Sequence, residues 1–86
     1  MDNPSRFSIL VIEDDADSRG NLQDLLEMEE YAVATAATAA EALARTDWAR
    51  FAVIILDRLL PDARAEDLLP ELKRLAPQAD VIIVTG

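Results

Sequence analysis

Three acidic side chains that directly follow two apolar segments are the residues of this chain best suited to chemistry. The segment 7–12 ends at Glu13 and Asp14, and the segment 51–56 ends at Asp57. Segments this apolar and β-branched are typical of buried strands in a parallel sheet, where ligands collect at the carboxyl ends of the strands. If the two strands are neighbours, the three carboxylates meet and repel one another unless a cation lies between them. The sequence therefore predicts a divalent-metal site with Asp57 as the reactive group.

The composition is that of one small, ordered and acidic domain. The chain has 86 residues, of which 51% are hydrophobic and only two are glycine. A net charge of −9 argues against direct binding of nucleic acid by this segment. Because cysteine and histidine are absent, disulfides, zinc sites and histidine-based catalysis are excluded. The polar N-terminus and the shortness of every apolar run predict a cytoplasmic protein without a membrane span.

Strands and helices are expected to alternate along the sequence. Four strands are predicted, at 7–12, 31–37, 51–56 and 81–84, with the second one suited to the edge of a sheet. The segments between them carry leucine or alanine at helical spacing, and we interpret these leucines and Trp48 as core or packing residues. The order βαβαβαβ, with long right-handed crossovers, predicts an α/β fold with a doubly wound parallel sheet.

Several local signals indicate where the helices begin. Asp15 and Asp17 are both candidate caps of the first helix, and Asp15 is better placed as a cap or a solvated neighbour than as a metal ligand. Residues 38–41 form a capping box. Pro70 fits the first turn of the third helix if Asp67 is its N-cap. If that helix begins near Ala65 instead, we expect a kink at Pro70. A turn role is expected for Asp62.

The last predicted strand is apolar on both faces, and the chain stops directly after it. An exposed edge of this kind favours pairing with another strand. We therefore expect the chain to be a fragment of a longer protein. Otherwise, we expect the exposed edge of the last strand to be covered by a partner or by a swapped copy of the chain. A dimer through this edge is a further possibility, and we expect the isolated chain to fold poorly as a monomer.

Three motifs in order resemble the receiver domains of two-component response regulators, the CheY-like family. They are Ile9–Asp15, then Val53–Asp57 with Leu-Pro-Asp at 60–62, and finally Val81–Gly86. The resemblance covers Phe7 to Gly86 and implies a flavodoxin-like fold with strand order 2-1-3-4, truncated after the fourth strand. Residues 1–86 would then be the N-terminal portion of a receiver domain, without its final helix, strand and helix.

The resemblance also implies a function. Asp57 would accept a phosphoryl group from a histidine kinase or phosphotransfer protein, with Mg²⁺ as cofactor, and so switch an effector or kinase domain in the same longer chain. Such a domain is a self-phosphorylating switch rather than a turnover enzyme. Asp14, Asp57 and the backbone carbonyl of Leu59 would bind the Mg²⁺, Glu13 would act through water, and Thr85 would be the switch hydroxyl.

The chain departs from the pattern of the receiver family in two respects. The lysine and the aromatic residue of the family's fifth strand lie beyond the last residue of this chain, and its only lysine is Lys73, within a predicted helix. Ala65 stands where many relatives have glycine, which affects the loop that carries Leu59.

Three other functions fit the sequence less well. A pseudo-receiver, which keeps the fold as an interaction or dimerisation surface without phosphorylation, is the alternative, and a failure to bind Mg²⁺ would favour it. A haloacid-dehalogenase-type phosphatase needs a second acid two residues after its nucleophile, where this chain has Leu59. Dinucleotide binding is excluded because no glycine-rich turn follows any strand.

Overall fold

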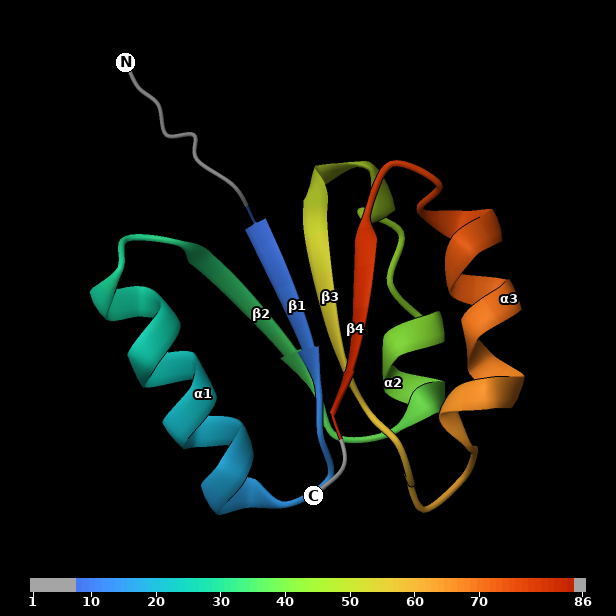
Figure 1. Cartoon of the computed structure of the whole chain (residues 1–86), viewed down its shortest axis with the longest axis horizontal. Coiled ribbons are helices and arrows are strands. Elements are labelled where there is room, and N and C mark those ends of the chain that lie inside the picture. Colours follow the sequence, from blue (N-terminus) through green and yellow to red (C-terminus); the bar gives the residue numbers. More distant parts are fainter. Residues whose placement is uncertain (1–7, 85–86) are drawn as a thin grey trace.

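Four parallel strands form a single sheet in the computed structural model, which describes residues 8–84. They are β1 (Ser8–Ile12), β2 (Ala32–Ala36), β3 (Phe51–Asp57) and β4 (Asp80–Val84), in the order β2-β1-β3-β4 (Figure 1). The predicted flavodoxin-like strand order 2-1-3-4 is confirmed, and β2 is an edge strand as expected.

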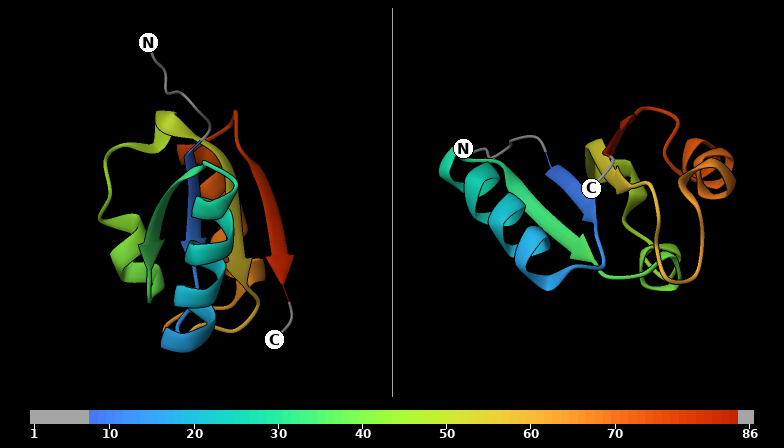
Figure 2. Two further views of the ribbon diagram at one scale, coloured as in Figure 1. Left: turned by 90° about the vertical axis from the view of Figure 1, so that its left-hand side faces the viewer. Right: turned by 60° about the horizontal axis from the view of Figure 1, so that its bottom comes forward.

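Helices cover both faces of this sheet, as a doubly wound fold requires. One face carries α1 (Ala16–Met28), and the other carries α2 (Ala39–Leu43) and α3 (Ala65–Leu75) (Figures 1 and 2). A short 3₁₀ helix, Trp48–Arg50, leads into β3. None of the helices in the described part of the chain is long and apolar enough to cross a membrane.

The hydrophobic core lies between the sheet and the α2–α3 layer. All five residues of β1 are buried, as the apolar run predicts for a central strand. Leu72 of α3 is fully buried against this side of the sheet, and Leu68 is buried with it. The largest fully buried side chains are Phe51, Leu10, Ile12, Ile54, Leu56, Leu72 and Val11.

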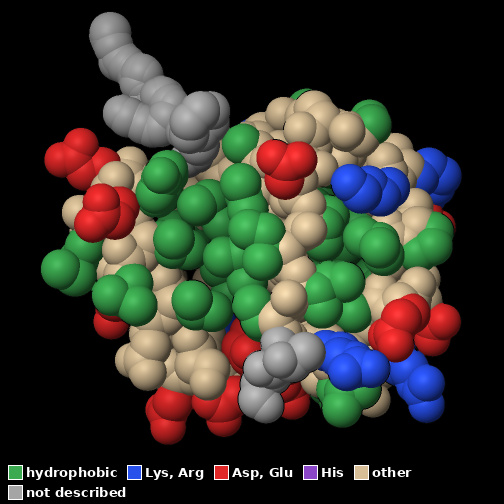
Figure 3. All heavy atoms as spheres, viewed as in Figure 1, with side chains coloured by type: hydrophobic (Ala, Val, Ile, Leu, Met, Phe, Trp, Pro, Cys, Tyr) green, Lys and Arg blue, Asp and Glu red, His purple; other side chains and the backbone are tan. Residues whose placement is uncertain are grey.

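The face beside α1 is packed less completely. No residue of α1 is buried, and the side chain of Leu25 is 60% exposed, so the expected core or packing role does not hold for Leu25. A groove lined by Ile9, Leu26, Val53 and Ile82 runs along this face. Figure 3 shows hydrophobic side chains gathered over the strands beside α1. Leu22 and Leu26 of the same stripe are partly buried, whereas Leu25 is exposed.

The helix starts follow the predicted caps in two cases out of three. The Asp15 carboxylate accepts from the Ser18 amide at 2.8 Å, and Thr38 Oγ1 accepts from the Glu41 amide at 3.0 Å. By contrast, α3 begins at Ala65 and not after Asp67, and its N-cap residue makes no side-chain hydrogen bond.

Pro70 therefore lies inside α3, where it cannot donate to the carbonyl four residues earlier. The kink that we expect for a helix beginning at Ala65 stays a prediction.

A cluster of charged and aromatic residues closes the amino-terminal edge of the sheet. The indole N–H of buried Trp48 donates to the Arg45 carbonyl at 2.9 Å, and its ring meets the Phe51 ring edge-on at 6.1 Å. Arg45 donates to both oxygens of the Asp47 carboxylate, at 2.9 and 2.8 Å. These hydrogen bonds, assisted by one from Arg50, lower the pKa of Asp47 to about 2.

Candidate metal centre

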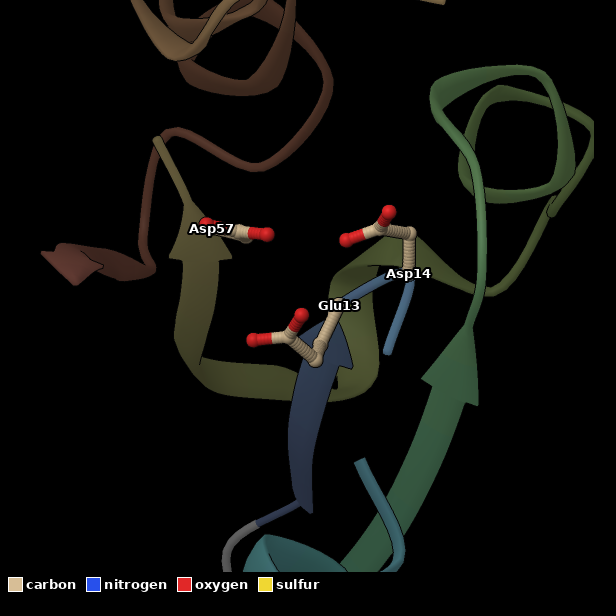
Figure 4. Close-up of side chains that lie close together, drawn as sticks. All are labelled: Glu13, Asp14 and Asp57. Atoms are coloured by element: carbon tan, nitrogen blue, oxygen red, sulfur yellow. The ribbon is translucent and has the colours of Figure 1, made fainter. Parts of the chain in front are cut away.

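The register of the parallel strands brings the acidic residues to one edge of the sheet. Ile12 pairs with Leu56, so the next residues along the two strands, Glu13 and Asp57, leave the sheet side by side. One carboxylate oxygen from each of Glu13, Asp14 and Asp57 lies within 4.8 Å of the other two. Figure 4 shows the three side chains pointing towards a common space, two from the end of β1 and one from the end of β3. The predicted meeting of these carboxylates is confirmed.

Two members of this cluster are poorly hydrated. Glu13 and Asp57 are each only 9% exposed, whereas Asp14 is exposed. Burial raises the pKa of Glu13 above its ordinary value and the charge of Asp57 adds to the effect, although a hydrogen bond from the Asp15 amide opposes it. Crowded carboxylates of this kind are relieved by a cation, and a set of hard oxygen donors suits Mg²⁺ or Ca²⁺. The residues therefore fit a divalent metal.

The turn between β1 and α1 is held from several directions. The Glu13 amide donates to the Ala36 carbonyl of β2 at 3.0 Å, and one Glu13 carboxylate oxygen accepts from the Asp15 amide at 3.0 Å. Arg19 donates from Nη1 to the main-chain carbonyls of Glu13 at 3.0 Å and of Asp14 at 3.3 Å. The sequence indicated the Asp15 cap, but the contacts of Arg19 were not foreseen.

The loop after Asp57 is closed by main-chain hydrogen bonds. The Arg58 amide donates to the Val84 carbonyl at 3.0 Å, and the Ala65 amide donates to the Arg58 carbonyl at 2.9 Å. The Leu59 amide lies 3.5 Å from Asp57 Oδ1, at the limit of a hydrogen bond. Leu59 therefore lies beside the acidic cluster.

A hollow open to solvent surrounds the cluster. Its lining residues are Glu13, Asp14, Asp15, Ser18, Asp57, Arg58 and Leu59. Arg58 contributes the basic side chain of this lining and lies 3.9 Å from Glu66 in an exposed ion pair. Thr85, the predicted switch hydroxyl, lies outside the described residues.

Asp62 has a contact that the sequence did not reveal. Its two carboxylate oxygens accept from the amides of Ala39 and Ala40, both at 2.9 Å, and these bonds lower its pKa. The loop after the acidic cluster is thereby tied to the start of α2. The first amides of a helix have no hydrogen-bond partner within the helix, so an acceptor for them is expected. An acceptor more than twenty residues away, however, cannot be found from the local sequence.

Comparison with known proteins agrees with this geometry. The family model of the response regulator receiver domain matches residues 9–86. The C4-dicarboxylate transport transcriptional regulatory protein DctD of Rhizobium meliloti is 33% identical over 79 residues, which are 92% of this chain and 17% of DctD. The DNA-binding transcriptional regulator NtrC of Bradyrhizobium is also 33% identical, over 92% of this chain and 16% of NtrC. The chain thus spans about a sixth of the length of these relatives.

Solved receiver structures share the fold and part of the sequence. A CheY-like receiver domain protein from Methanospirillum hungatei superimposes with a TM-score of 0.88 at 36% identity, over 95% of this chain and 66% of that one. A response regulator from Burkholderia pseudomallei, solved with a phosphorylated aspartic acid, calcium ion and citrate, gives 0.86 at 32% identity, over 94% and 48%. The regulator TrrA from Thermotoga maritima, in complex with Mg²⁺ and BeF, gives 0.82 at 28% identity, over 93% and 70%. The family match, these relatives and the edge of acidic residues together show that the chain belongs to the response regulator receiver domains of two-component systems.

Proposed function

We propose that this domain accepts a phosphoryl group on Asp57 from the phosphohistidine of a histidine kinase or phosphotransfer protein, and that it requires Mg²⁺ to do so. The observation that carries the proposal is the convergence of Glu13, Asp14 and Asp57 within 4.8 Å at the carboxyl edge of the sheet. The phosphorylated aspartic acid and calcium ion in the Burkholderia pseudomallei regulator support it.

The residues present would hold Mg²⁺ unequally. Asp14, Asp57 and the main-chain carbonyl of Leu59 are the proposed direct ligands, and Glu13 acts through a water molecule. One Glu13 oxygen already accepts from the Asp15 amide, which leaves this side chain less free to move onto a metal. The bound ion supplies positive charge that offsets the charge on the phosphoryl oxygens during transfer.

The proposed step is an in-line displacement at phosphorus. A carboxylate oxygen of Asp57 forms a bond to the phosphorus while the bond from phosphorus to the donor's imidazole nitrogen breaks. The imidazole keeps that electron pair and takes up a proton, and the product is an acyl phosphate on Asp57. Asp57 ends its strand at a hollow open to solvent, so a donor has access to it. In this proposal the domain is a self-phosphorylating switch rather than a turnover enzyme.

Phosphorylation of Asp57 would change the surface around this site, and that change would be passed on to another domain. Thr85 is the proposed hydroxyl that responds to the phosphoryl group, and an effector or kinase domain in the same longer protein is the proposed receiver of the signal. The relatives named as transcriptional regulators, of which this chain matches about a sixth, support such an arrangement. A cytoplasmic location and the absence of direct nucleic-acid contacts by this segment stay predictions.

The edge of the sheet is a second proposed contact. Ile82 and Ile83 of β4 are 50% and 41% exposed, and β4 has a strand on only one side among the described residues. Unpaired apolar edges favour pairing with a further strand. We propose a dimer through this edge, which sedimentation at several protein concentrations tests. A monomer at every concentration would contradict it.

Intact-mass measurement after incubation with acetyl phosphate tests the main proposal. We expect a gain of one phosphoryl group that needs Mg²⁺ and disappears in Asp57→Asn. Asp24→Asn, an exposed acid on α1, is the matched control and should gain the group like the wild type. Absence of the gain in the wild-type chain would favour the pseudo-receiver alternative. A gain that persists in Asp57→Asn would place the acceptor elsewhere.

A further inference from the structure

Arg19 connects the first turn of α1 to the main chain of two acidic residues. Its Nη1 atom donates to the carbonyl oxygen of Glu13 at 3.0 Å and to that of Asp14 at 3.3 Å. Its own amide donates to the Asp15 carbonyl at 2.9 Å, so the residue that reaches back is itself fixed in the helix. The side chain is half-buried, which strengthens hydrogen bonds made by a charged donor.

Arg19 contacts the main chain of Glu13 and Asp14 and makes no hydrogen bond to their carboxylates. Both residues that Arg19 contacts belong to the cluster, and Figure 4 shows their side chains pointing towards Asp57. The Glu13 amide is held by β2, through the Ala36 carbonyl, so the turn is fixed at its start by the sheet and at its carbonyls by Arg19. A metal ligand binds best when its backbone and orientation are set before the ion arrives.

We propose that Arg19 is a positioning residue for the divalent-metal site, and that it raises the affinity for the ion by fixing the main chain of Glu13 and Asp14. This inference rests on the proposed function of the site. The proposal and a purely electrostatic role predict opposite changes in metal affinity when Arg19 is removed. Arg19 carries a positive charge beside a cation site, so by charge alone its removal would tighten binding. If it positions the ligands, its removal weakens binding instead.

Calorimetric titration with Mg²⁺ alone separates these two effects. Loss of groups that orient metal ligands typically costs about 10–100-fold in affinity, and we expect at least about tenfold for Arg19→Gln. Arg74→Gln is the matched control, because it also removes one positive charge, from an exposed ion pair with Glu71 on α3. Unchanged or tighter binding by Arg19→Gln would overturn the proposal.

Should Arg19→Gln fail to fold, Arg19→Lys decides in its place. Weaker binding at unchanged charge supports the positioning role, and wild-type affinity overturns it. If the wild-type chain itself binds no Mg²⁺, the proposed function fails, which is a different result from a bound ion that Arg19 does not influence.

A second measurement needs no metal. The Asp15 amide donates to the Glu13 carboxylate within the turn that Arg19 holds, so its hydrogen exchange reports the order of that turn. We expect faster exchange at Asp15 in Arg19→Gln, with unchanged protection in the central strand β1. A charge-only role predicts no change at Asp15, and that result would count against the proposal.

Discussion

Replacing the proposed acceptor should stabilise the metal-free domain. One carboxylate oxygen from each residue of the cluster lies within 4.8 Å of the other two. At that distance two like charges repel by about 0.9 kcal/mol in water and by about 3.5 kcal/mol at an effective dielectric constant of 20. Asp57 takes part in two such pairs, of which the one with exposed Asp14 lies near the lower value. We therefore expect Asp57→Asn to raise the free energy of unfolding by about 1–3 kcal/mol.

Thermal unfolding followed by circular dichroism, at low ionic strength with a chelator, measures this effect. For a domain of this size each kcal/mol shifts the midpoint by about 4–8 °C, so Asp57→Asn should melt about 4–24 °C above the wild type. Asp24→Asn is the control, since it changes the net charge of −9 by the same one unit at an exposed position on α1. Added Mg²⁺ at about a hundred times its Kd should stabilise the wild type by about 2.7 kcal/mol and Asp57→Asn much less.

Two results would refute this reasoning. If Asp57→Asn melts no higher than Asp24→Asn without metal, the carboxylates do not repel one another in the folded domain. If Mg²⁺ stabilises Asp57→Asn as much as the wild type, the ion binds elsewhere on the protein. Either outcome would remove the physical basis for assigning the cluster as a metal centre.

Three further predictions concern the scaffold, and all are measured by unfolding experiments. Asp62→Ala removes the acceptor of two α2 amides and should lower the midpoint at pH 7, whereas Asp62→Glu should restore it only in part because the longer chain misplaces the oxygens. Asp47 has a pKa of about 2 against about 3.9 in an unfolded chain, so its ion pair stabilises the fold above about pH 4. The midpoint of Asp47→Asn should accordingly lie below that of the wild type at pH 7, and the difference should shrink as the pH falls from about 4 to 2. Leu72→Ala opens a cavity at a fully buried position and should cost about 2–5 kcal/mol.

Each of these predictions has a contrary outcome. An Asp62→Ala variant that melts like the wild type would show that water replaces the carboxylate at the start of α2. A midpoint difference for Asp47→Asn that stays constant from pH 7 to pH 2 would show that the charge of Asp47 contributes nothing. A loss below about 1 kcal/mol for Leu72→Ala would mean that the core collapses into the cavity.

The sheet and the acidic cluster could be predicted because both depend on strong, regular signals. Buried parallel strands produce apolar runs, and parallel strands place their carboxyl ends at one edge. Those two facts bring Glu13 and Asp57 together once β1 and β3 are neighbours, and the resemblance to receiver domains supplied that strand order. The capping residues Asp15 and Thr38 were also predictable, since a cap acts within three residues of its own position.

The contacts that could not be predicted join segments through loop geometry. The Asp62 carboxylate accepts from amides at the start of α2, more than twenty residues away in the sequence. Arg19 donates to main-chain carbonyls, and because every residue has one, the sequence does not show which carbonyl is contacted. The start of α3 at Ala65 was left open because no side-chain cap marks it. The exposure of Leu25 was missed for a different reason: periodicity shows which face of a helix is apolar, but not how much structure covers that face.

The position of Trp48 has a consequence for spectroscopy. It is the chain's only tryptophan, and it is buried beside Phe51 at the amino-terminal edge of the sheet. Asp57 lies at the other end of the same strand, about 20 Å away for six residues of extended chain. Intrinsic fluorescence should therefore follow global unfolding faithfully and stay nearly silent when an ion or a phosphoryl group arrives at the acidic edge. An optical assay of ligand binding in this domain will need a fluorophore placed near the hollow, for example at Ser18.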